Sequence, residues 1–391
     1  MLATWHSSSD RTFSATLRYV RTFCPLEQSL TVGSGPPFTH PTLPKAAHFI
    51  GASTPRNTPN RYLAAINALF DTYTLDVSWG AGLDVMPNED DLRISDAIPL
   101  VVNTMGWTKG LGADLNDQIA AFVRPTAVFA FETPAVDLGW LSRPQDSAHF
   151  DTVEALVYVL QAATNEPLAV HYTPADHRAL SILAYLHAVF PASVAGDGTK
   201  DLVAQKWNCT PLCRRSPFEV DCLKSFDSIY LDAPGGEDVV AAEIGGVLNG
   251  ALVALVVTDP GAVDITTLEG GSKMDQRWHY TQGAEPPMPS LSRCLGLALI
   301  RGVFEDQLSE SSRVHLVTPI PAALLGQARV MVKGEIELPI WGWLDKGEAT
   351  GGPEKTRESA PFLRWSGVGN EGVLGGERRR VRRNLMRKGQ L

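Results

Sequence analysis

The chain has 391 residues and a formal net charge of −9, and hydrophobic residues make up 44% of it. This length suits two domains with buried cores, and the acidic balance excludes a body that binds nucleic acid over its whole surface, so any such contact must be local. Five irregularly spaced cysteines argue against a disulfide framework and indicate a reducing compartment. Because the sequence has no apolar run of membrane-spanning length and no signal-peptide order at its N-terminus, we expect no membrane partner.

The first third of the chain alternates turn-rich blocks with apolar ones. Residues 35–40 (GPPFTH) are typical of a loop, and residues 49–56 (FIGASTPR) predict the end of a strand and the start of a helix. Apolar residues then follow at helical spacing at Tyr62, Ile66, Leu69 and Phe70. Residues 77–96 are polar, acidic and rich in glycine, which predicts a surface insertion.

The next stretch predicts a strand, a glycine-rich loop and a helix in succession. Residues 98–102 are a short apolar run, residues 113–123 have a helical pattern, and a second strand is predicted at 127–132. This alternation favours a parallel, doubly wound sheet, in which the loop lies at the carboxyl ends of the strands, where ligands bind. A tryptophan between glycines can stack on an unpaired base or plug a structural turn. The polar and aromatic loop residues are Asn103, Thr104, Trp107 and Lys109.

A helix is predicted again from Asp176 to His187, with Asp176 as its cap. From about residue 201 short strand-like runs separated by Gly, Pro and Asp predict a β-rich domain, at 228–231, 252–257, 314–318 and 329–332. Cys209, Cys213 and Cys222 have the wrong spacing for a zinc site and lack a fourth ligand, so we expect no metal there.

The end of the chain contains an apolar segment, a linker and a basic tail. Residues 338–343 (LPIWGW) are bounded by proline, which suits either a partner-docking segment or a last strand packed on its own domain. Residues 346–358 are rich in Gly, Glu and Lys and predict a disordered linker. Arginines crowd residues 378–388 without interleaved acids, which favours a nucleic-acid contact or a nuclear import signal.

Several of these blocks together resemble one family. Residues 103–112 (NTMGWTKGLG) are similar to the N-T-x-G-W-x-K-G-x-G element of the polynucleotide 5′-hydroxyl kinases, which are P-loop RNA kinases. Other blocks match the nucleolar, ribosomal RNA-processing branch in order, and the tail looks fungal. These blocks lie at residues 35–40, 49–56, 176–181, 295–302, 316–321, 332–342 and 378–390.

The resemblance implies a fold and a function. The expected fold is an α/β, P-loop NTPase-type parallel sheet, incomplete at the N-terminus, followed by a smaller β-rich domain. The expected boundaries are 1–200 for the kinase domain, 201–345 for the β-rich domain, 346–372 for the linker and 373–391 for the basic tail. The implied reaction transfers the γ-phosphate of ATP, with Mg²⁺, to RNA 5′-hydroxyl ends after spacer cleavage. The implied partners are RNA and the rRNA-processing endonuclease, and the implied location is the nucleus and nucleolus.

The resemblance also implies site residues. Asn103, Thr104, Trp107 and Lys109 are the expected substrate-binding residues. Arg178, on a mobile lid helix that closes over ATP, is the expected catalytic residue. Trp341 is the expected contact with the endonuclease.

This sequence departs from the family pattern at its N-terminus. The motif G-x-x-x-x-G-K-[ST], whose backbone and lysine hold phosphates, does not occur in the chain. Residues 7–14 and 15–20 stand where the loop and its helix are expected, and residues 23–30 lack the paired aspartates of the following strand. We therefore predict no intact cofactor-binding residues and no metal ligands. Three functions stay open: an RNA kinase, a catalytically dead scaffold for the endonuclease, and another nucleotide-binding enzyme of the same fold.

Overall fold

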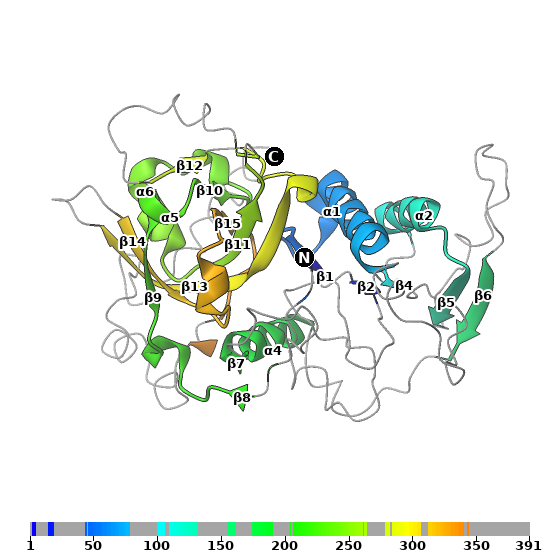
Figure 1. The fold of residues 1–391 in the computed structure, drawn as a ribbon, viewed down its shortest axis with the longest axis horizontal. Coiled ribbons are helices and arrows are strands. Elements are labelled where there is room, and N and C mark those ends of the chain that lie inside the picture. Colours follow the sequence, from blue (N-terminus) through cyan, green and yellow to red (C-terminus); the bar gives the residue numbers. More distant parts are fainter. Residues whose placement is uncertain are drawn as a thin grey trace, which may run out of the picture.

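The computed structural model describes residues 2–4, 15–18, 44, 46–78, 100–105, 109–131, 155–161, 174–190, 204, 206–260, 262–263, 278–281, 284–305, 312–339 and 342–343. It has two neighbouring parts (Figure 1). One part carries short strands beside two helices, and the other is built on a seven-stranded sheet.

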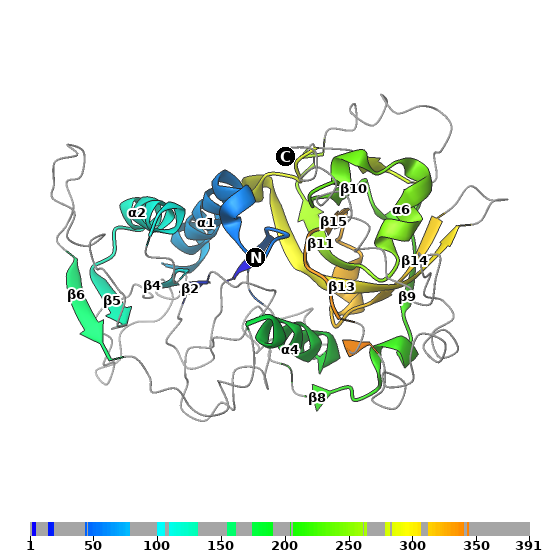
Figure 2. The same ribbon diagram turned by 180° about the vertical axis from the view of Figure 1, so that it is seen from behind.

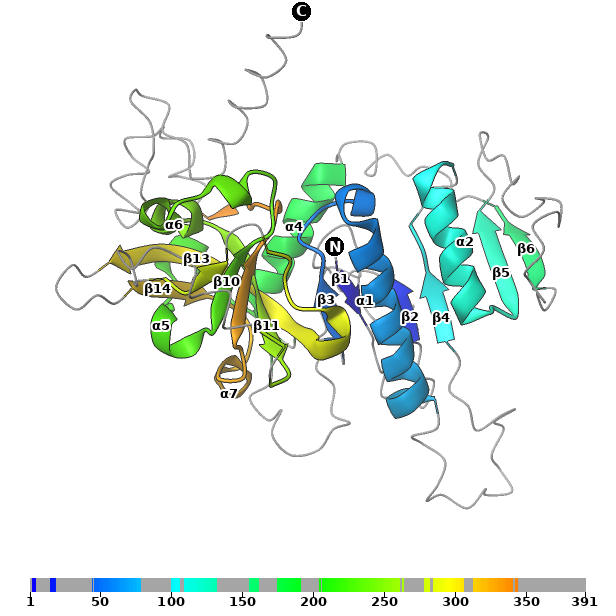
Figure 3. The same ribbon diagram turned by 90° about the horizontal axis from the view of Figure 1, so that it is seen from above.

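The N-terminal part contains three strand pairs, and Figure 3 shows β3, β1, β2, β4, β5 and β6 following one another across it. The β1–β3 pair is antiparallel, whereas β2–β4 and β5–β6 are parallel, as the βα alternation predicts. The strands are β1 (Leu2–Thr4), β2 (Ala15–Arg18), β3 (Ala47–Phe49), β4 (Leu100–Asn103), β5 (Ala127–Phe131) and β6 (Leu156–Leu160). The two long helices are α1 (Pro59–Thr72) and α2 (Leu111–Val123).

Helix α1 forms where the sequence predicts it. Pro59 is its first residue, where the missing N–H of proline costs nothing. Its buried face consists of Tyr62, Ala65, Ile66 and Leu69, which recur at the i, i+3, i+4, i+7 spacing of one helix face. This face packs against α2 in a small core of its own.

The structure corrects the expectation for residues 15–20. The resemblance places a helix there, but Ala15–Arg18 is strand β2, paired in parallel with β4 from Leu100 to Asn103. A short apolar run carries no periodicity that separates strand from helix, so its partner decides. The absence of a phosphate-loop sequence is consistent with this outcome, because no loop–helix junction is encoded here.

The second part confirms the β-rich prediction. Its strand order is β12-β10-β15-β11-β13-β14-β9, with β10 parallel to β12 and β15 and the remaining pairs antiparallel. The strands are β9 (Phe218–Asp221), β10 (Ser228–Leu231), β11 (Leu252–Thr258), β12 (Tyr280–Thr281), β13 (Ser292–Glu305), β14 (Ser312–Val317) and β15 (Val330–Lys333). The short helices α5 (Cys222–Ser225), α6 (Ala241–Leu248) and α7 (Ala322–Leu325) accompany them.

Both faces of this sheet carry a core. Along β11, Leu252, Ala254 and Val256 belong to one cluster, and Val253 and Leu255 belong to the other. This alternation is the two-residue period of a strand that is buried on both sides. Residues of α6 complete one core, and residues of α4 (Pro174–His187) complete the other.

Helix α4 is a core element over its second half, which departs from the expectation of a mobile lid. Ile182, Tyr185 and Leu186 are almost fully buried in the core of the seven-stranded sheet. The Leu297 N–H of β13 donates to Tyr185 Oη at 3.1 Å. A Cβ at Gly296 would lie 2.3 Å from that oxygen, so this close approach requires glycine. Figure 2 shows α4 beneath β13.

Smaller elements complete the described chain. They are the single-turn helices Pro55–Asn57, Leu212–Arg214, Gly236–Asp238 and Pro289–Leu291, the π-helix Tyr73–Val77, and the strand pair β7 (Ala188–Val189) with β8 (Lys206–Trp207). None of the helices in the described ranges combines the length and apolar character needed to cross a membrane.

Candidate functional site

The predicted RNA-binding residues lie in the loop between β4 and α2. Asn103, Thr104 and Lys109 are exposed, and they follow the carboxyl end of a parallel strand, as predicted. Gly110 has φ +56°, a value that favours glycine, and it turns the chain into α2. Trp107 lies outside the described residues.

One side chain anchors this loop. Met105 is only 4% exposed, although its neighbours Asn103 and Thr104 are exposed. It belongs to the core cluster that contains Tyr62, Ile66 and Leu69 of α1, and Leu115 and Ile119 of α2. The position of α1 therefore affects the position of Met105, where the loop begins, because the two share a close-packed core.

Arg178 lies in the first half of α4 and is half-buried. It makes no hydrogen bond or ion pair with another described residue. Helix α4 packs under the seven-stranded sheet, whereas β4 and α2 belong to the neighbouring part (Figure 2). Arg178 and the described residues of the β4–α2 loop do not belong to one group of contacting side chains. The catalytic role of Arg178 therefore stays a prediction.

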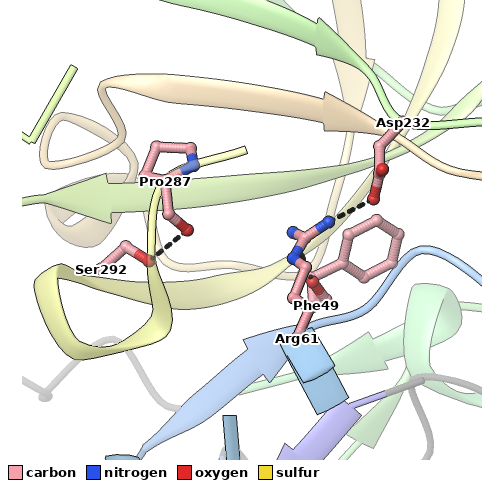
Figure 4. Close-up of polar contacts among 5 residues, drawn as sticks. All are labelled: Phe49, Arg61, Asp232, Pro287 and Ser292. Atoms are coloured by element: carbon pink, nitrogen blue, oxygen red, sulfur yellow. Dashed lines mark hydrogen bonds and ion pairs between the residues drawn. The ribbon is translucent and has the colours of Figure 1, made fainter. Parts of the chain in front are cut away.

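A polar contact that the sequence analysis missed joins the two parts (Figure 4). Arg61, in the first turn of α1, forms an ion pair with Asp232, the residue after β10, and both side chains are largely buried. A second Arg61 nitrogen donates to the Phe49 carbonyl of β3 at 3.1 Å. The available signal was an arginine in a helical first turn that has no acid of its own, since the helix dipole disfavours a cation there.

Two glycines cross beside this ion pair. The Glu335 N–H donates to the Gly51 carbonyl at 2.7 Å, and a Cβ at Gly334 would lie 2.2 Å from that carbonyl oxygen. Gly51 itself has φ +79°. The sequence blocks at residues 49–56 and 332–342 therefore meet backbone to backbone. We call the set Phe49, Gly51, Arg61, Asp232, Gly334 and Glu335 the interdomain joint.

A small cleft lies beside the joint, and it is too small to hold a nucleotide. Its free volume is about 20 Å³, which is room for one water molecule. Its wall includes His48. Burial, and to a lesser extent the charge of Arg61, lowers the pKa of His48 to about 4, so the ring is neutral at pH 7. Burial raises the pKa of the Cys294 thiol to about 12, which leaves no reactive thiolate. On the far wall the Ser292 hydroxyl donates to the Met288 carbonyl at 2.8 Å, and the Pro287 carbonyl lies 3.4 Å from the same Oγ (Figure 4).

The segment at residues 338–343 is fixed at both ends. Leu338 and Trp343 are buried in the core that also contains Ile182 and Tyr185 of α4. The Cys213 N–H donates to the Trp343 carbonyl at 3.1 Å. The interpretation of a segment that leaves its domain without disturbing it is therefore wrong for Trp343. Trp341 lies outside the described residues, and its docking role stays a prediction.

The residues of this chain do not fit a bound nucleotide triphosphate. The sequence has no glycine-rich phosphate loop with its lysine. In the part of the chain that the structure describes, no group of three His, Cys, Asp or Glu side chains could hold a metal ion. Cys213 and Cys222 are buried free thiols, and Cys209 is exposed.

Comparisons with known proteins agree with this division of the molecule. Residues 24–188 match the family model described as mRNA cleavage and polyadenylation factor CLP1 P-loop. The chain is 35% identical over 380 residues to polynucleotide 5′-hydroxyl-kinase GRC3 of Cryptococcus neoformans var. neoformans serotype D (strain B-3501A), covering 91% of this chain and 48% of that protein. These likenesses support the polynucleotide 5′-hydroxyl-kinase family for this chain.

Other members of the family are more distant. The GRC3 kinase of Yarrowia lipolytica is 28% identical over 361 residues, covering 90% of this chain and 48% of that protein. The grc3 kinase of Schizosaccharomyces pombe is 25% identical over 358 residues, covering 87% and 44%. The chain thus spans about half the length of the curated relatives it matches. A solved structure of the interface between Pcf11p and Clp1p matches with a TM-score of 0.42 and 13% identity, covering 80% of this chain and 59% of that one.

The family confirms the predicted fold class. A P-loop-type α/β part with parallel strand pairs precedes a β-rich part, and the family model covers the first of these. The predicted boundaries at 200, 345 and 372 stay predictions. The family also indicates use of ATP, although the phosphate-binding residues of that reaction do not occur in this chain.

Proposed function

We propose that this chain is the RNA-binding part of a polynucleotide 5′-hydroxyl kinase that acts on ribosomal RNA precursors. The observation that carries the proposal is the β4–α2 loop. It places Asn103, Thr104 and Lys109 in solvent at the end of a parallel strand while Met105 holds the loop to the core. Its relatives are named polynucleotide 5′-hydroxyl kinases, which supports the substrate class.

The loop residues suit a single-stranded RNA end. Lys109 supplies a positive charge for a phosphate, and Asn103 and Thr104 supply hydrogen-bonding groups for sugar and phosphate oxygens. Trp107 offers a face on which a terminal base stacks. Arg178 would neutralise charge at the transferred phosphoryl group. ATP, with Mg²⁺, would donate that group, but the residues of this chain do not fit the nucleotide.

RNA binding tests the proposal directly. Fluorescence anisotropy with a labelled 5′-hydroxyl single-stranded RNA should show binding that weakens roughly 5- to 150-fold in Trp107→Ala, the range for loss of base stacking. Lys109→Ala should weaken binding and lower its salt dependence. Lys206→Ala, which removes another exposed lysine, serves as the control. Unchanged affinity in both loop variants would refute the proposal.

Phosphate transfer gives a second test. Because the phosphate loop and the paired carboxylates are missing from its sequence, this chain alone should transfer no label from γ-labelled ATP to a 5′-hydroxyl RNA. Labelled RNA that disappears in Arg178→Ala would contradict this expectation and establish a different phosphate site.

A second candidate is a catalytically inactive scaffold for the rRNA-processing endonuclease, and the absence of a phosphate-loop sequence from this chain favours it. Leu338 and Trp343, on either side of Trp341 in the sequence, are core residues. Trp341→Ala should lower the affinity for the nuclease tens-fold, in the range for an interface tryptophan. Co-purification and a spacer-RNA cleavage assay decide the matter, with Trp343→Phe as the control. Full complex with full cleavage would remove Trp341 from the interface.

The basic tail bears on location. We propose that the arginines of residues 378–388 hold the protein in the nucleus and nucleolus. Deleting them should let a tagged protein spread into the cytoplasm. The experiment needs cells that lack the endonuclease, because a bound partner could carry the chain in. An unchanged nucleolar signal there would refute the proposal.

A further inference from the structure

Burying the ion pair between Arg61 and Asp232 carries a desolvation penalty. The side chains are 12% and 18% exposed, so both charges have lost most of their water. Arg61 also lies in the first turn of α1, where the helix dipole repels a cation. A desolvated ion pair contributes little net stability compared with apolar side chains of similar size, so stability alone does not explain it.

The geometry of the joint suggests what the pair does. Gly51 and Gly334 cross backbone to backbone with one hydrogen bond, from Glu335 N–H to the Gly51 carbonyl. The crossing of two glycines sets the separation of the two parts at this point, and Ala47 and Phe49 of β3 pack in the core of the seven-stranded sheet. Arg61 adds a polar tie to this packing, because it binds Asp232 at the end of β10 and the Phe49 carbonyl on β3 at the same time.

Helix α1 connects Arg61 to the β4–α2 loop through a shared core. Tyr62, the residue after Arg61, shares a core cluster with Met105, the buried anchor of the β4–α2 loop. Ile66 and Leu69, on the next turns of α1, belong to the same cluster. A rotation of α1 about the glycine crossing would therefore displace Met105 and, with it, the adjoining Thr104.

We infer that the Arg61–Asp232 pair is a positioning device, through which the C-terminal sheet sets the orientation of α1 and holds Thr104 and Met105, where the β4–α2 loop begins, in place for RNA binding. Neither residue touches the RNA. This inference rests on the proposed RNA-binding function of that loop. It assigns to the C-terminal part a role in substrate binding that the loop residues alone do not disclose.

The test compares two ion pairs at opposite ends of strand β10. Asp232 follows β10, whereas Asp227 precedes β10 and pairs with Arg329, which precedes β15. Arg61→Met and Arg329→Met remove one arginine from each pair. A charge exchange, Arg61→Asp together with Asp232→Arg, offers rescue. The readouts are affinity for a labelled 5′-hydroxyl RNA, hydrogen exchange in residues 100–112, and the thermal midpoint of the full chain.

Arg61→Met should weaken RNA binding about tenfold, a usual size for coupling between sites, and should accelerate exchange in residues 100–112. Arg329→Met should change neither, and the charge exchange should restore part of the affinity. If Arg61→Met lowers the thermal midpoint but leaves both exchange and affinity as in Arg329→Met, the pair is only structural and the inference fails. If the unmodified chain binds no RNA, the proposed function fails, and the exchange measurement still decides whether the joint positions the loop.

Discussion

Strands β11 and β6 have similar sequences and opposite surroundings. Both are runs of apolar residues, LVALVVT in β11 and LVYVL in β6. The first four residues of β11 are at most 1% exposed, and the fifth, Val256, is 6% exposed. Every residue of β6 is exposed, from 39% at Leu160 to 63% at Leu156. An apolar run thus predicts a strand correctly without saying what covers it.

The difference comes from neighbours. β11 lies between β13 and β15, and residues of α4 and α6 belong to the cores on its two faces. β6 pairs only with β5 among the described strands, and there Phe129 and Tyr158 stack with their ring centres 5.2 Å apart. Large exposed apolar surfaces are uncommon on a monomer. A covering element would therefore stabilise the β5–β6 pair by burying its apolar side chains.

The largest test of this comparison removes a side chain that covers the seven-stranded sheet. Trp343→Ala should lower the free energy of unfolding by about 3–5 kcal/mol, because the indole is 1% exposed in the core beneath the sheet. Trp343→Phe should cost much less, since the indole N–H has no hydrogen-bond partner among the described residues to lose. Urea unfolding followed by circular dichroism measures both. Equal losses in the two variants would mean that aromatic packing is not what Trp343 supplies.

A slightly smaller effect is expected inside the sheet. Leu255→Ala in β11 should destabilise the chain by about 2–5 kcal/mol through lost burial and the cavity left behind. Leu160→Ala in β6 makes the same chemical change at a 39% exposed position and should cost far less. Similar losses at the two positions, measured by urea unfolding, would show that β6 is covered in solution and that β11 and β6 do not differ in burial.

Lowering the pH should destabilise the folded chain through His48, which lies at the border between the two parts. The pKa of His48 is about 4 in the folded chain and near 6.5 when unfolded, so the unfolded state binds the proton more readily. The stabilisation is complete above pH 6.5 and is lost as the pH falls towards 4, which amounts to roughly 2 kcal/mol at pH 5. His48→Gln should flatten this part of the pH profile, whereas His279→Gln at an exposed position should not. A pH profile unchanged by His48→Gln would assign the acid sensitivity to other groups.

The smallest effect belongs to the exposed strand. Val157→Thr in β6 should change the free energy of unfolding by less than about 0.5 kcal/mol, because its surroundings are already solvent. Val253→Thr in β11 should cost about 1–3 kcal/mol, since it buries a hydroxyl group in an apolar core. A large loss in Val157→Thr would reveal an unseen neighbour of β6.

Local sequence patterns predicted most of the elements and part of the site. The helical spacing of Tyr62, Ile66 and Leu69 predicted α1, and the apolar run before Asn103 predicted β4 and the exposed loop after it. Periodicity is a local property, so it survives in any surroundings. The family resemblance was wrong for residues 15–18, where it placed a helix and the parallel pairing with β4 decided in favour of a strand.

The sequence by itself determined the family, the two-part order of the chain and the chemistry of the β4–α2 loop, because these depend on residue types at fixed spacing. Only the tertiary structure decided that Trp343 and the second half of α4 are core, that β6 is uncovered, and that Arg61 meets Asp232. Each of these depends on residues far apart in the chain, 171 positions in the case of the ion pair. Contacts at such separation leave no periodic trace in the sequence, since packing and charge pairing are settled only when the two parts come together.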